Sequence, residues 1–445
     1  MHIVIIGNGV AGISTARHVR KLSDHQITVI SSETPHFWSR TALMYIYMGH
    51  MKYEHTKPYE DHFWAKNRID LCYDHVLRID TAAREVHLRS GQPLKYDKLV
   101  LATGSRPNKY GWPGQDLAGV QGMVSYQDLL GMEKYTEGLR RAVIVGGGLI
   151  GIEMAEMFHA RHIPATFLVR EQSFWNGVIP TDESAMINRE ILANGIDLRL
   201  GTELKEILPD AQGRVRAIRT STGEEIACEF VGLTAGVSPN IDLAQGTAIE
   251  TQRGFLVDEH LQTSVPDVYA AGDCAELRHP APGRRSIEAV WYTGKLMGPV
   301  LARTLCGMPT PYRQTTWFNS AKFMDIEWQT YGDVAAQARP GEQHLYWEHA
   351  SGRKSVRINY DAASGQVKGF NLMGIRYRQE VCHYWIERGA HIEQVLQELG
   401  AANFDPEFYR QYEAEVVALY NQQTGRNLAL RHRRGLRSVL RVLQA

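Results

Sequence analysis

Two glycine-rich turns of the same kind, residues 7–12 and 146–151, each follow a run of β-branched residues and open a helical pattern. Such a turn can hold the pyrophosphate of a dinucleotide. Its glycines permit a tight bend, and the unpaired N–H groups at the helix start bind the anion. One such turn is weak evidence of a site. Two in one chain predict two bound dinucleotides and electron transfer between them.

The patterns around the turns predict two βαβ units with parallel strands buried on both faces. The chain then returns to the first unit, so the second dinucleotide domain is expected to lie inside the first. From residue 315 aromatic residues become dense, and alternating strands followed by two helical patterns predict a separate α+β domain. The expected strands are 2–6, 26–31, 96–101, 142–145, 165–169, 195–200, 230–235, 255–257, 267–273, 355–360 and 366–372; the expected helices are 11–22, 149–162, 379–388 and 391–399, with a further helix opening at 274–276.

Composition excludes several classes of protein. A chain of 445 residues is too long for one core, and 49 basic against 49 acidic residues give no electrostatic reason to expect a nucleic-acid partner. No apolar run reaches the length of about 18 residues that spans a membrane. The five cysteines are scattered and no metal-ligand spacing occurs, so we expect a cytoplasmic protein without disulfides or a metal site.

In the first turn Gly7 permits the bend, Gly9 lets the backbone approach a pyrophosphate, and Gly12 lets helix and strand pack closely. An acid that binds a ribose diol is expected at the end of the second strand, and Glu33 is the candidate. The alternative is a glycine turn and a solvated acid in an ordinary α/β domain.

Four motifs occur in a fixed order: residues 7–12, 102–107 (Ala-Thr-Gly-Ser-Arg-Pro), 146–151 followed by Glu153, and 269–273 (Tyr-Ala-Ala-Gly-Asp). This order resembles the flavoprotein pyridine-nucleotide oxidoreductases of the glutathione-reductase-like superfamily. Residues 33–43 resemble the flavin-facing segment of its ferredoxin, rubredoxin and nitrite reductase branch. The resemblance covers residues 1 to about 310.

The resemblance implies FAD in the first site and NADH or NADPH in the second. The FAD-binding domain would comprise residues 1–112 and 245–314, and the NAD(P)H-binding domain residues 113–244. The residues implied for FAD are Gly7, Gly9, Val10, Ala11, Gly12, Glu33, Arg40, Ala102, Thr103, Gly104, Gly272 and Asp273. Those implied for NAD(P)H are Gly146, Gly148, Leu149, Ile150, Gly151, Glu153, Arg170, Glu171 and Gly236.

The choice between the two coenzymes stays open at residues 170–171. Arg170 could pair with the 2′-phosphate of NADPH, while Glu171 could bind the free diol of NADH and would repel that phosphate. Arg170 could equally be a solvated charge at a strand end.

The flavin-facing segment 38–51 contains no cysteine, so a redox-active disulfide is excluded at the place where the disulfide reductases carry it. Cys274 is expected to be a small buried residue. Tyr45 stands where the electron-transfer branch often has lysine, and residues 290–294 lack the glutamines common in quinone reductases. No catalytic acid or base is required for hydride delivery, and none is assigned.

The expected function is therefore hydride transfer from NAD(P)H to FAD, followed by electron transfer to a ferredoxin- or rubredoxin-like protein. The alternatives are an NAD(P)H oxidase, a quinone or small-molecule reductase, and an NADH-responsive sensor like the apoptosis-inducing-factor relatives. In related reductases the C-terminal domain, here 315–425, closes over the flavin and often mediates a homodimer. The basic tail 426–445 could form an amphipathic helix that meets an acidic protein or an anionic membrane surface, or a solvated terminus.

Overall fold

The structure is a computed structural model that describes residues 1–405, 407–408 and 410–431. It divides into two compact units. The first comprises Met1–Gly146, Ala160–Pro164 and Leu204–Gln314, and the second comprises Gly147–His159, Ala165–Glu203 and Thr315–Ala445. Within the described residues, no helix is long and apolar enough to cross a membrane.

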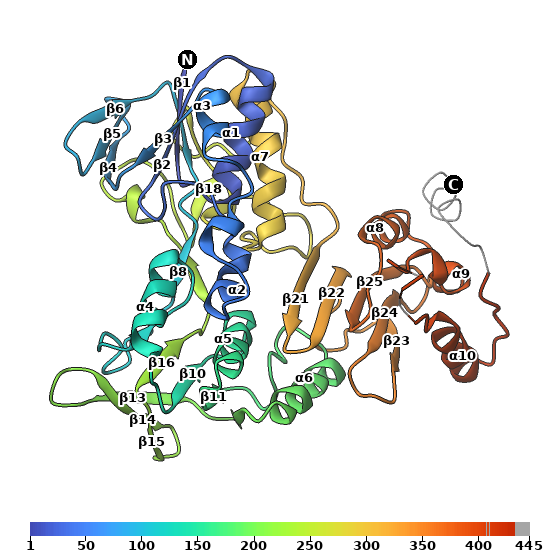
Figure 1. The fold of residues 1–445 in the computed structure, drawn as a ribbon. Coiled ribbons are helices and arrows are strands. Elements are labelled where there is room, and N and C mark those ends of the chain that lie inside the picture. Colours follow the sequence, from blue (N-terminus) through green and yellow to red (C-terminus); the bar gives the residue numbers. More distant parts are fainter. Residues whose placement is uncertain (406, 409, 432–445) are drawn as a thin grey trace. The chain divides into compact units, whose positions relative to one another are not determined.

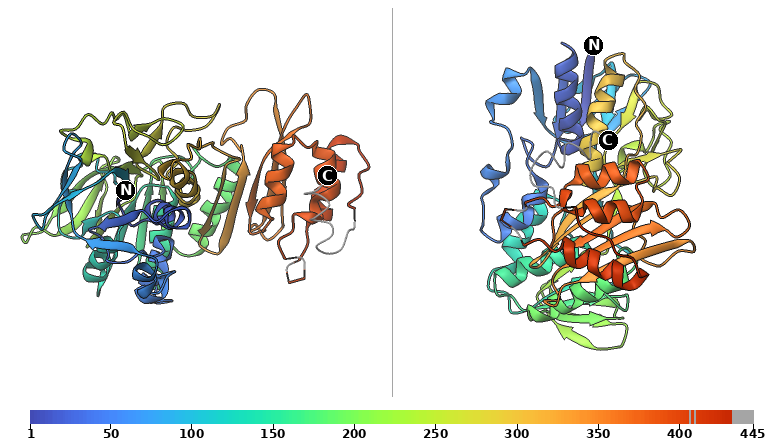
Figure 2. Two further views of the ribbon diagram at one scale, coloured as in Figure 1. Left: turned by 90° about the horizontal axis from the view of Figure 1, so that it is seen from above. Right: turned by 90° about the vertical axis from the view of Figure 1, so that its right-hand side faces the viewer.

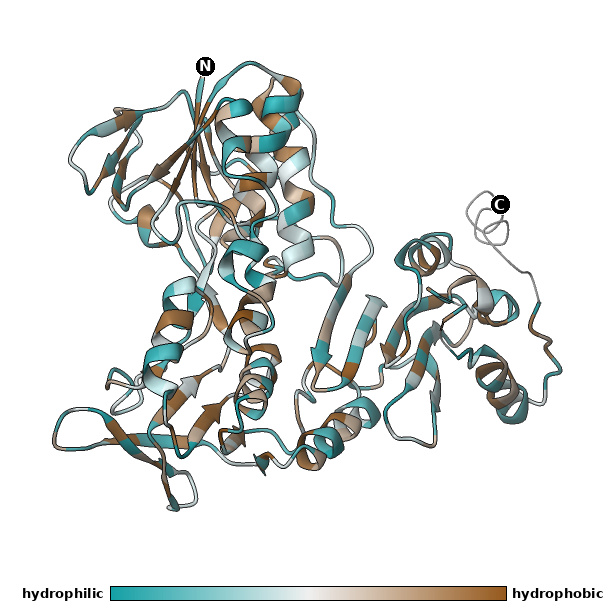
Figure 3. Ribbon diagram, in the orientation of Figure 1, coloured by the Kyte–Doolittle hydropathy of each residue, from teal (hydrophilic) through white to brown (hydrophobic). Residues whose placement is uncertain are grey.

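The centre of the first unit is a parallel sheet in the order β19-β7-β1-β2-β3. Its strands are β1 (His2–Ile6), β2 (Gln26–Ser31), β3 (Ile69–Tyr73), β7 (Lys98–Leu101) and β19 (Val268–Ala270). The middle of each inner strand, residues 3–6, 27–30 and 99–101, is buried and almost entirely apolar, as expected where both faces of a parallel sheet are covered (Figure 3). The strands predicted at 2–6 and 26–31 are confirmed.

Helices α1 (Val10–Leu22) and α7 (Trp291–Leu305) lie side by side against this sheet (Figure 1). Their close approach depends on a small residue: a Cβ added to Gly298 of α7 would lie 2.4 Å from the Cβ of Ser14. Helix α1 carries Arg20 and Lys21 in its last turn, where positively charged side chains interact favourably with the helix dipole. The packing leaves the N-terminus of α1 at the end of β1, where the first glycine turn lies.

The rest of the first unit consists of short elements around this core. Its helices are α2 (Leu43–Tyr47), α3 (His62–Lys66) and α4 (Tyr126–Thr136), with 3-10 turns at Arg40–Ala42, Tyr53–Thr56 and Asp242–Ala244. Its antiparallel sheets are β4 (Val76–Asp80), β5 (Glu85–Leu88) and β6 (Pro93–Lys95); β13 (Leu204–Pro209), β14 (Val215–Thr220) and β15 (Glu225–Ala227); and β8 (Ser105–Pro107) with β17 (Val237–Pro239). Its parallel pairs join β16 (Phe230–Leu233) to β10 (Ala142–Val145) and β9 (Val120–Gln121), and β18 (Phe255–Val257) to β20 (Ala275–Leu277).

The helix predicted to open at residues 274–276 is wrong. These residues form β20, and the next helix, α7, begins only at Trp291. Glu276 is buried and accepts hydrogen bonds from the backbone N–H groups of Arg253 (2.7 Å) and Gly254 (2.8 Å). These contacts and the pairing with β18 hold the segment extended, and a local helical pattern does not reveal them.

The second unit contains α5 (Leu149–Ala160), β11 (Ala165–Val169), α6 (Thr181–Ala193) and β12 (Asp197–Leu200), with β11 and β12 parallel. It ends in an antiparallel sheet with the order β21-β22-β25-β24-β23. The strands of this sheet are β21 (Phe318–Phe323), β22 (Ile326–Gly332), β23 (Glu342–Glu348), β24 (Ser355–Asp361) and β25 (Val367–Met373). The helices that follow it are α8 (Gln379–Glu387), α9 (Ile392–Glu398) and α10 (Glu413–Thr424), with a 3-10 turn at Leu399–Ala401.

This sheet has a different neighbour on each face: α6 lies on one, and α8 and α10 lie on the other (Figure 2). Val356 and Ile358 of β24 join the apolar core with Trp385 of α8, while Arg357 between them contacts α6. Of the aromatic residues that become dense after residue 315, Phe323, Trp328, Tyr331 and Trp347 are buried, whereas Trp317, Phe318 and Tyr346 are partly exposed.

Taken together, the chain is an α/β protein whose parallel strands and helices are Rossmann-like, followed by a C-terminal α+β region. The basic tail falls largely outside the described residues. Of its arginines, Arg426 pairs with Glu393 (3.1 Å) and Arg431 with Glu398 (3.4 Å), both acids of α9. The choice between an amphipathic helix and a solvated terminus for the tail depends on residues 432–445, which lie outside the described part.

Candidate cofactor sites

The first glycine turn joins β1 to α1, and each glycine has its own steric reason. Gly7 has φ +115°, and a Cβ there would lie 2.1 Å from the carbonyl oxygen of Ala102. A Cβ on Gly12 would lie 2.0 Å from the carbonyl oxygen of Gly7. A Cβ on Gly9 would meet no atom within 4 Å, so the backbone at Gly9 faces open space.

That open space adjoins the N-terminus of α1. Gly9 is the N-cap, no side chain caps the helix, and its first turn has no acid. The N–H groups of the first turn, which includes Val10 and Ala11, are therefore available to an anion that enters beside Gly9. The uncapped start of α1 and the open space on the Cβ side of Gly9 together fit the pyrophosphate of a dinucleotide.

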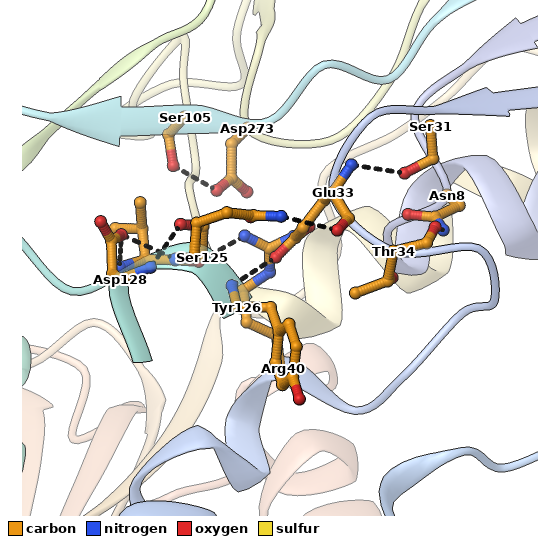
Figure 4. A network of polar contacts seen from close by, with 12 residues as sticks. Asn8, Ser31, Glu33, Thr34, Arg40, Ser105, Ser125, Tyr126, Asp128 and Asp273 are labelled. Atoms are coloured by element: carbon orange, nitrogen blue, oxygen red, sulfur yellow. Dashed lines mark hydrogen bonds and ion pairs between the residues drawn. The ribbon is translucent and has the colours of Figure 1, made fainter. Parts of the chain in front are cut away.

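Glu33 lies just beyond β2 and has specific partners (Figure 4). Its Oε2 pairs with the Arg40 guanidinium at 2.5 Å, and its Oε1 accepts from the backbone N–H of Tyr126 at 2.9 Å. Arg40 also donates to the carbonyl oxygen of Val124. The solvated-acid alternative for Glu33 is therefore wrong. A carboxylate has about four lone-pair positions, so two remain for a ribose diol.

No pattern in the sequence predicts that α4 reaches Glu33, although a local signal marks the start of that helix. Ser125 and Asp128 form a capping box, in which the Ser125 Oγ accepts from the Asp128 N–H at 3.1 Å and the Asp128 carboxylate accepts from the Ser125 N–H at 2.9 Å (Figure 4). The capping box fixes the first turn of α4 and thereby the position of the Tyr126 N–H, which donates a hydrogen bond to Glu33.

Asp273 follows β19 and meets the segment that follows β7. Its carboxylate accepts from the Ser105 Oγ at 3.0 Å (Figure 4), and burial raises the pKa of Asp273. Thr103 donates from its Oγ1 to the carbonyl oxygen of Asn240 at 2.6 Å, next to Gly104 at φ +69°. The carboxyl group thus stands on the edge of the β7–β19 pair, where parallel α/β sheets bind ligands.

Neighbouring positions explain why this edge is built from small residues. Gly272 has φ +83°, and a Cβ there would lie 2.9 Å from the Cβ of Ala11. Cys274 is buried and donates from its Sγ to the carbonyl oxygen of Leu101 at 3.4 Å, and burial raises the pKa of its thiol. The expectation that Cys274 is a small buried residue is confirmed, and its thiol is unreactive as a nucleophile.

The second glycine turn repeats these features. Gly146, at φ +120°, would place a Cβ 2.6 Å from the backbone nitrogen of Ala235, and Gly236 at φ +86° lies close to the side-chain amide of Asn108. A Cβ on Gly147 would lie 2.7 Å from a methyl of Val169, whereas one on Gly148 would meet nothing within 4 Å. Gly148 thus matches Gly9. Helix α5 begins at Leu149 and continues through Ile150 and the buried Gly151.

The predicted acid Glu153 lies in the second turn of α5. Burial and the neighbouring carboxylate of Glu156 raise the pKa of Glu153 to about 7. At the end of β11, Arg170 and Glu171 pair with each other, with a guanidinium nitrogen 2.9 Å from a carboxylate oxygen. The two residues that compete in the choice of coenzyme therefore neutralise each other.

Two glycine cradles, each at the start of a helix and each open on its Cβ side, define a protein that binds two dinucleotides. Residues 1–294 match the family of pyridine nucleotide-disulphide oxidoreductases. The chain belongs to this family, whose cofactors are FAD and NAD(P)H.

Three similar proteins illustrate the range of the family. The chain is 27% identical over 371 residues to the assimilatory nitrate reductase electron transfer subunit of Bacillus subtilis, covering 82% of this chain and 47% of that subunit, and so spans about half of its length. It is 29% identical over 360 residues to the ferredoxin–NAD(+) reductase component of the biphenyl dioxygenase system of Paraburkholderia xenovorans, covering 80% and 86%. The fold is similar to that of an NAD-dependent persulfide reductase from A. fulgidus, with a TM-score of 0.83, 22% identity, and 96% and 84% of the two chains covered.

The family name includes a disulphide that this chain does not use. All five cysteines are free thiols, and Cys228, Cys274 and Cys382 are buried. The protein is therefore an FAD-dependent NAD(P)H oxidoreductase without a redox-active disulfide.

Proposed function

We propose that this chain takes hydride from NAD(P)H and passes electrons to a small ferredoxin- or rubredoxin-like protein. The observation that carries the proposal is the pair of open glycine cradles at Gly9 and Gly148. When bound, FAD would accept two electrons from the coenzyme and could release them one at a time to a one-electron acceptor. The relative from Paraburkholderia xenovorans, whose name includes ferredoxin, supports this class of acceptor.

In this proposal the two halves of the first site hold the two ends of FAD. The N–H groups of residues 10–12 bind the pyrophosphate, and Glu33, kept in place by Arg40 and Tyr126, accepts from the ribose hydroxyls. Asp273, with Ala102–Gly104 beside it, would accept from the ribityl chain. The domain limits 1–112, 113–244, 245–314 and 315–425 belong to the same proposal, as do a homodimer formed by the C-terminal domain and a cytoplasmic location.

The second site would bind the coenzyme at the start of α5. Residues 149–151 present the N–H groups, and Glu153 lies one turn further along the helix. The chain's contribution to hydride transfer is then to fix the coenzyme at near-attack distance and to exclude water, because hydride delivery itself needs no acid or base.

The test begins with the absorbance spectrum of the purified protein and an anaerobic titration with NADH and with NADPH. Reduced protein is then mixed in a stopped-flow instrument with a ferredoxin, a rubredoxin, a quinone and oxygen in parallel. We expect saturable and fastest reoxidation by one of the small redox proteins. Fastest reoxidation by oxygen or the quinone would replace the proposed acceptor by the oxidase or small-molecule alternative. An NADH-dependent change of oligomer size with slow reoxidation by all four would favour a sensor.

Substitutions at residues 170 and 171 should change KM for NADPH in opposite directions. Arg170→Ala should raise KM for NADPH about tenfold or more, because a bidentate contact to the 2′-phosphate is worth about 1.5–3 kcal/mol. Glu171→Gln should lower KM for NADPH, because it removes a repelling charge and frees Arg170 from its 2.9 Å partner. Flavin reduction rates with both coenzymes measure this. Equal small changes for NADH and NADPH in both variants would make the pair a surface ion pair only.

A further inference from the structure

Helix α5 carries two carboxylates on one face, three residues apart. Burial, and after it the carboxylate of Glu156, which is itself buried, raise the pKa of Glu153 to about 7. Glu153 therefore changes its charge close to neutral pH. Charged groups that contact Glu156 therefore also influence the pKa of Glu153.

The compensating charge comes from the C-terminal domain. Lys322 of β21 places its Nζ 2.6 Å from the Oε1 of Glu156. The Oε2 of Glu156 is buried and has no hydrogen-bond partner among the described residues. One oxygen of this carboxylate thus depends on Lys322, and the other is unsatisfied, so loss of Lys322 would leave a buried charge without compensation.

Packing of the neighbouring residue anchors the end of β21 that carries Lys322. That residue, Phe323, is fully buried, and its ring packs on those of Phe174 (5.9 Å between centroids) and Trp175 (6.1 Å). Glu327 lies opposite Lys322 in the β21–β22 register, and Arg376 binds the Glu327 carboxylate. The anchored strand end thus places the Lys322 Nζ beside Glu156.

We propose that Lys322 is a positioning residue that sets the charge of Glu153 through Glu156, and thereby the preference of the nicotinamide site for oxidised over reduced coenzyme. The inference rests on the proposed function, which places the coenzyme at the start of α5, and it takes Glu153, one turn further along the helix, as the acid beside the nicotinamide ring. The ring of the oxidised coenzyme carries a positive charge and that of the reduced coenzyme is neutral. An ionised Glu153 therefore favours the oxidised form.

The proposal gives opposite signs for two substitutions. Removing Lys322 takes a cation away from the Glu153–Glu156 pair. The pKa for loss of the second proton from this pair should therefore rise. Removing the charge of Glu156 takes an anion away from Glu153, so Glu153 ionises at lower pH. A lysine that merely tethers β21 to α5 would shift neither value.

The experiment is calorimetric titration of the flavin-loaded protein with NAD⁺ and with 1,4,5,6-tetrahydro-NAD, a neutral-ring analogue that cannot donate hydride. The phosphorylated pair is used if NADPH is preferred. Because the adenosine half is common to both probes, the ratio of their Kd values reports the charge beside the ring. In the wild type we expect this ratio to change about tenfold in favour of NAD⁺ as the pH is raised, with the midpoint of the change near pH 7.

Lys322→Met should raise this midpoint by about one pH unit and Glu156→Gln should lower it by about one. The double variant should resemble Glu156→Gln, and Lys322→Arg should resemble the wild type. Midpoints that stay in place, or move in the same direction in both single variants, would overturn the inference. If Lys322→Met folds poorly, Lys322→Gln, which keeps a polar side chain, takes its place, and a midpoint unchanged from the wild type would overturn the inference. A wild type that binds neither probe would overturn the proposed function itself.

Discussion

Gly9→Ala should yield a stably folded protein that has lost most of its flavin. The position has φ −70° and ψ −179°, which alanine adopts without strain, and the new Cβ would meet no protein atom within 4 Å. The methyl group would instead occupy the space through which the pyrophosphate must pass to reach the N–H groups of α1. A clash with the ligand that costs about 1.4 kcal/mol already lowers affinity tenfold, and a sub-van-der-Waals contact costs more.

The matched control is Gly148→Ala, the corresponding change in the second turn, where the Cβ position is also open. It should leave the flavin in place and raise KM for the coenzyme. The ratio of flavin absorbance to protein absorbance, thermal melting and anaerobic NADH titration separate the two outcomes. If Gly9→Ala protein stayed fully yellow, or if both variants lost the same function, the assignment of one dinucleotide to each turn would fail.

Gly12→Ala should fail for a different reason. Its Cβ would lie 2.0 Å from the carbonyl oxygen of Gly7, so the turn itself must deform. The three glycines of one motif thus divide into one that faces the ligand and others that allow the protein to close on itself. A motif in the sequence does not distinguish these roles, because they depend on which atoms lie opposite each glycine.

The elements of the fold that the sequence predicted well are those fixed by local pattern. The strands at 2–6, 142–145 and 165–169 match β1, β10 and β11, and the glycine turns after β1 and β10 mark where α1 and α5 begin. The apolar runs are unambiguous there because both faces of a parallel sheet are buried. The segment 274–276 failed because three residues carry little pattern and its buried acid is satisfied by distant backbone N–H groups.

The partners of the site residues were not predictable, because they are remote in sequence. Glu33 was identified from its place after a strand, but the Tyr126 N–H that it accepts is 93 residues away. Glu156 and Lys322 are 166 residues apart, and neither lies in a recognisable motif. Spacing within one helix brings Glu153 and Glu156 together; only the tertiary structure brings the lysine.

Arg357→Met should destabilise the second unit by about 3–5 kcal/mol, because it leaves a buried carboxylate unpaired. The side chains of Arg357 and Glu183 are 4% and 0% exposed, and the guanidinium Nε lies 2.7 Å from the Glu183 Oε1. Asp182 adds a second contact at 2.6 Å. The pair joins β24 to the first turn of α6, so its loss should loosen both elements together.

Arg189→Ala provides the control from the same pair of surfaces. Arg189 of α6 pairs with Glu348 of β23 at 2.6 Å, but the arginine side chain is 53% exposed, so its loss should cost less than about 1 kcal/mol. Hydrogen–deuterium exchange over peptides that cover α6 and β24 is the suitable measurement, since a chain of several domains does not unfold in one step. Comparable protection in Arg357→Met and Arg189→Ala would contradict the prediction.

The double variant Glu183→Leu/Arg357→Met then separates the value of the ion pair from the cost of a lone buried charge. Replacing both charges by apolar side chains removes the desolvation penalty, so the double variant should regain most of the lost protection. Asn371, which donates to Glu183 at 3.0 Å and accepts from the Trp328 Nε1 at 2.6 Å, would lose one partner and limit the recovery. A double variant as unstable as Arg357→Met would mean that the arginine acts through its packing on Tyr346, 4.7 Å from the ring centroid, and not through the charge of Glu183.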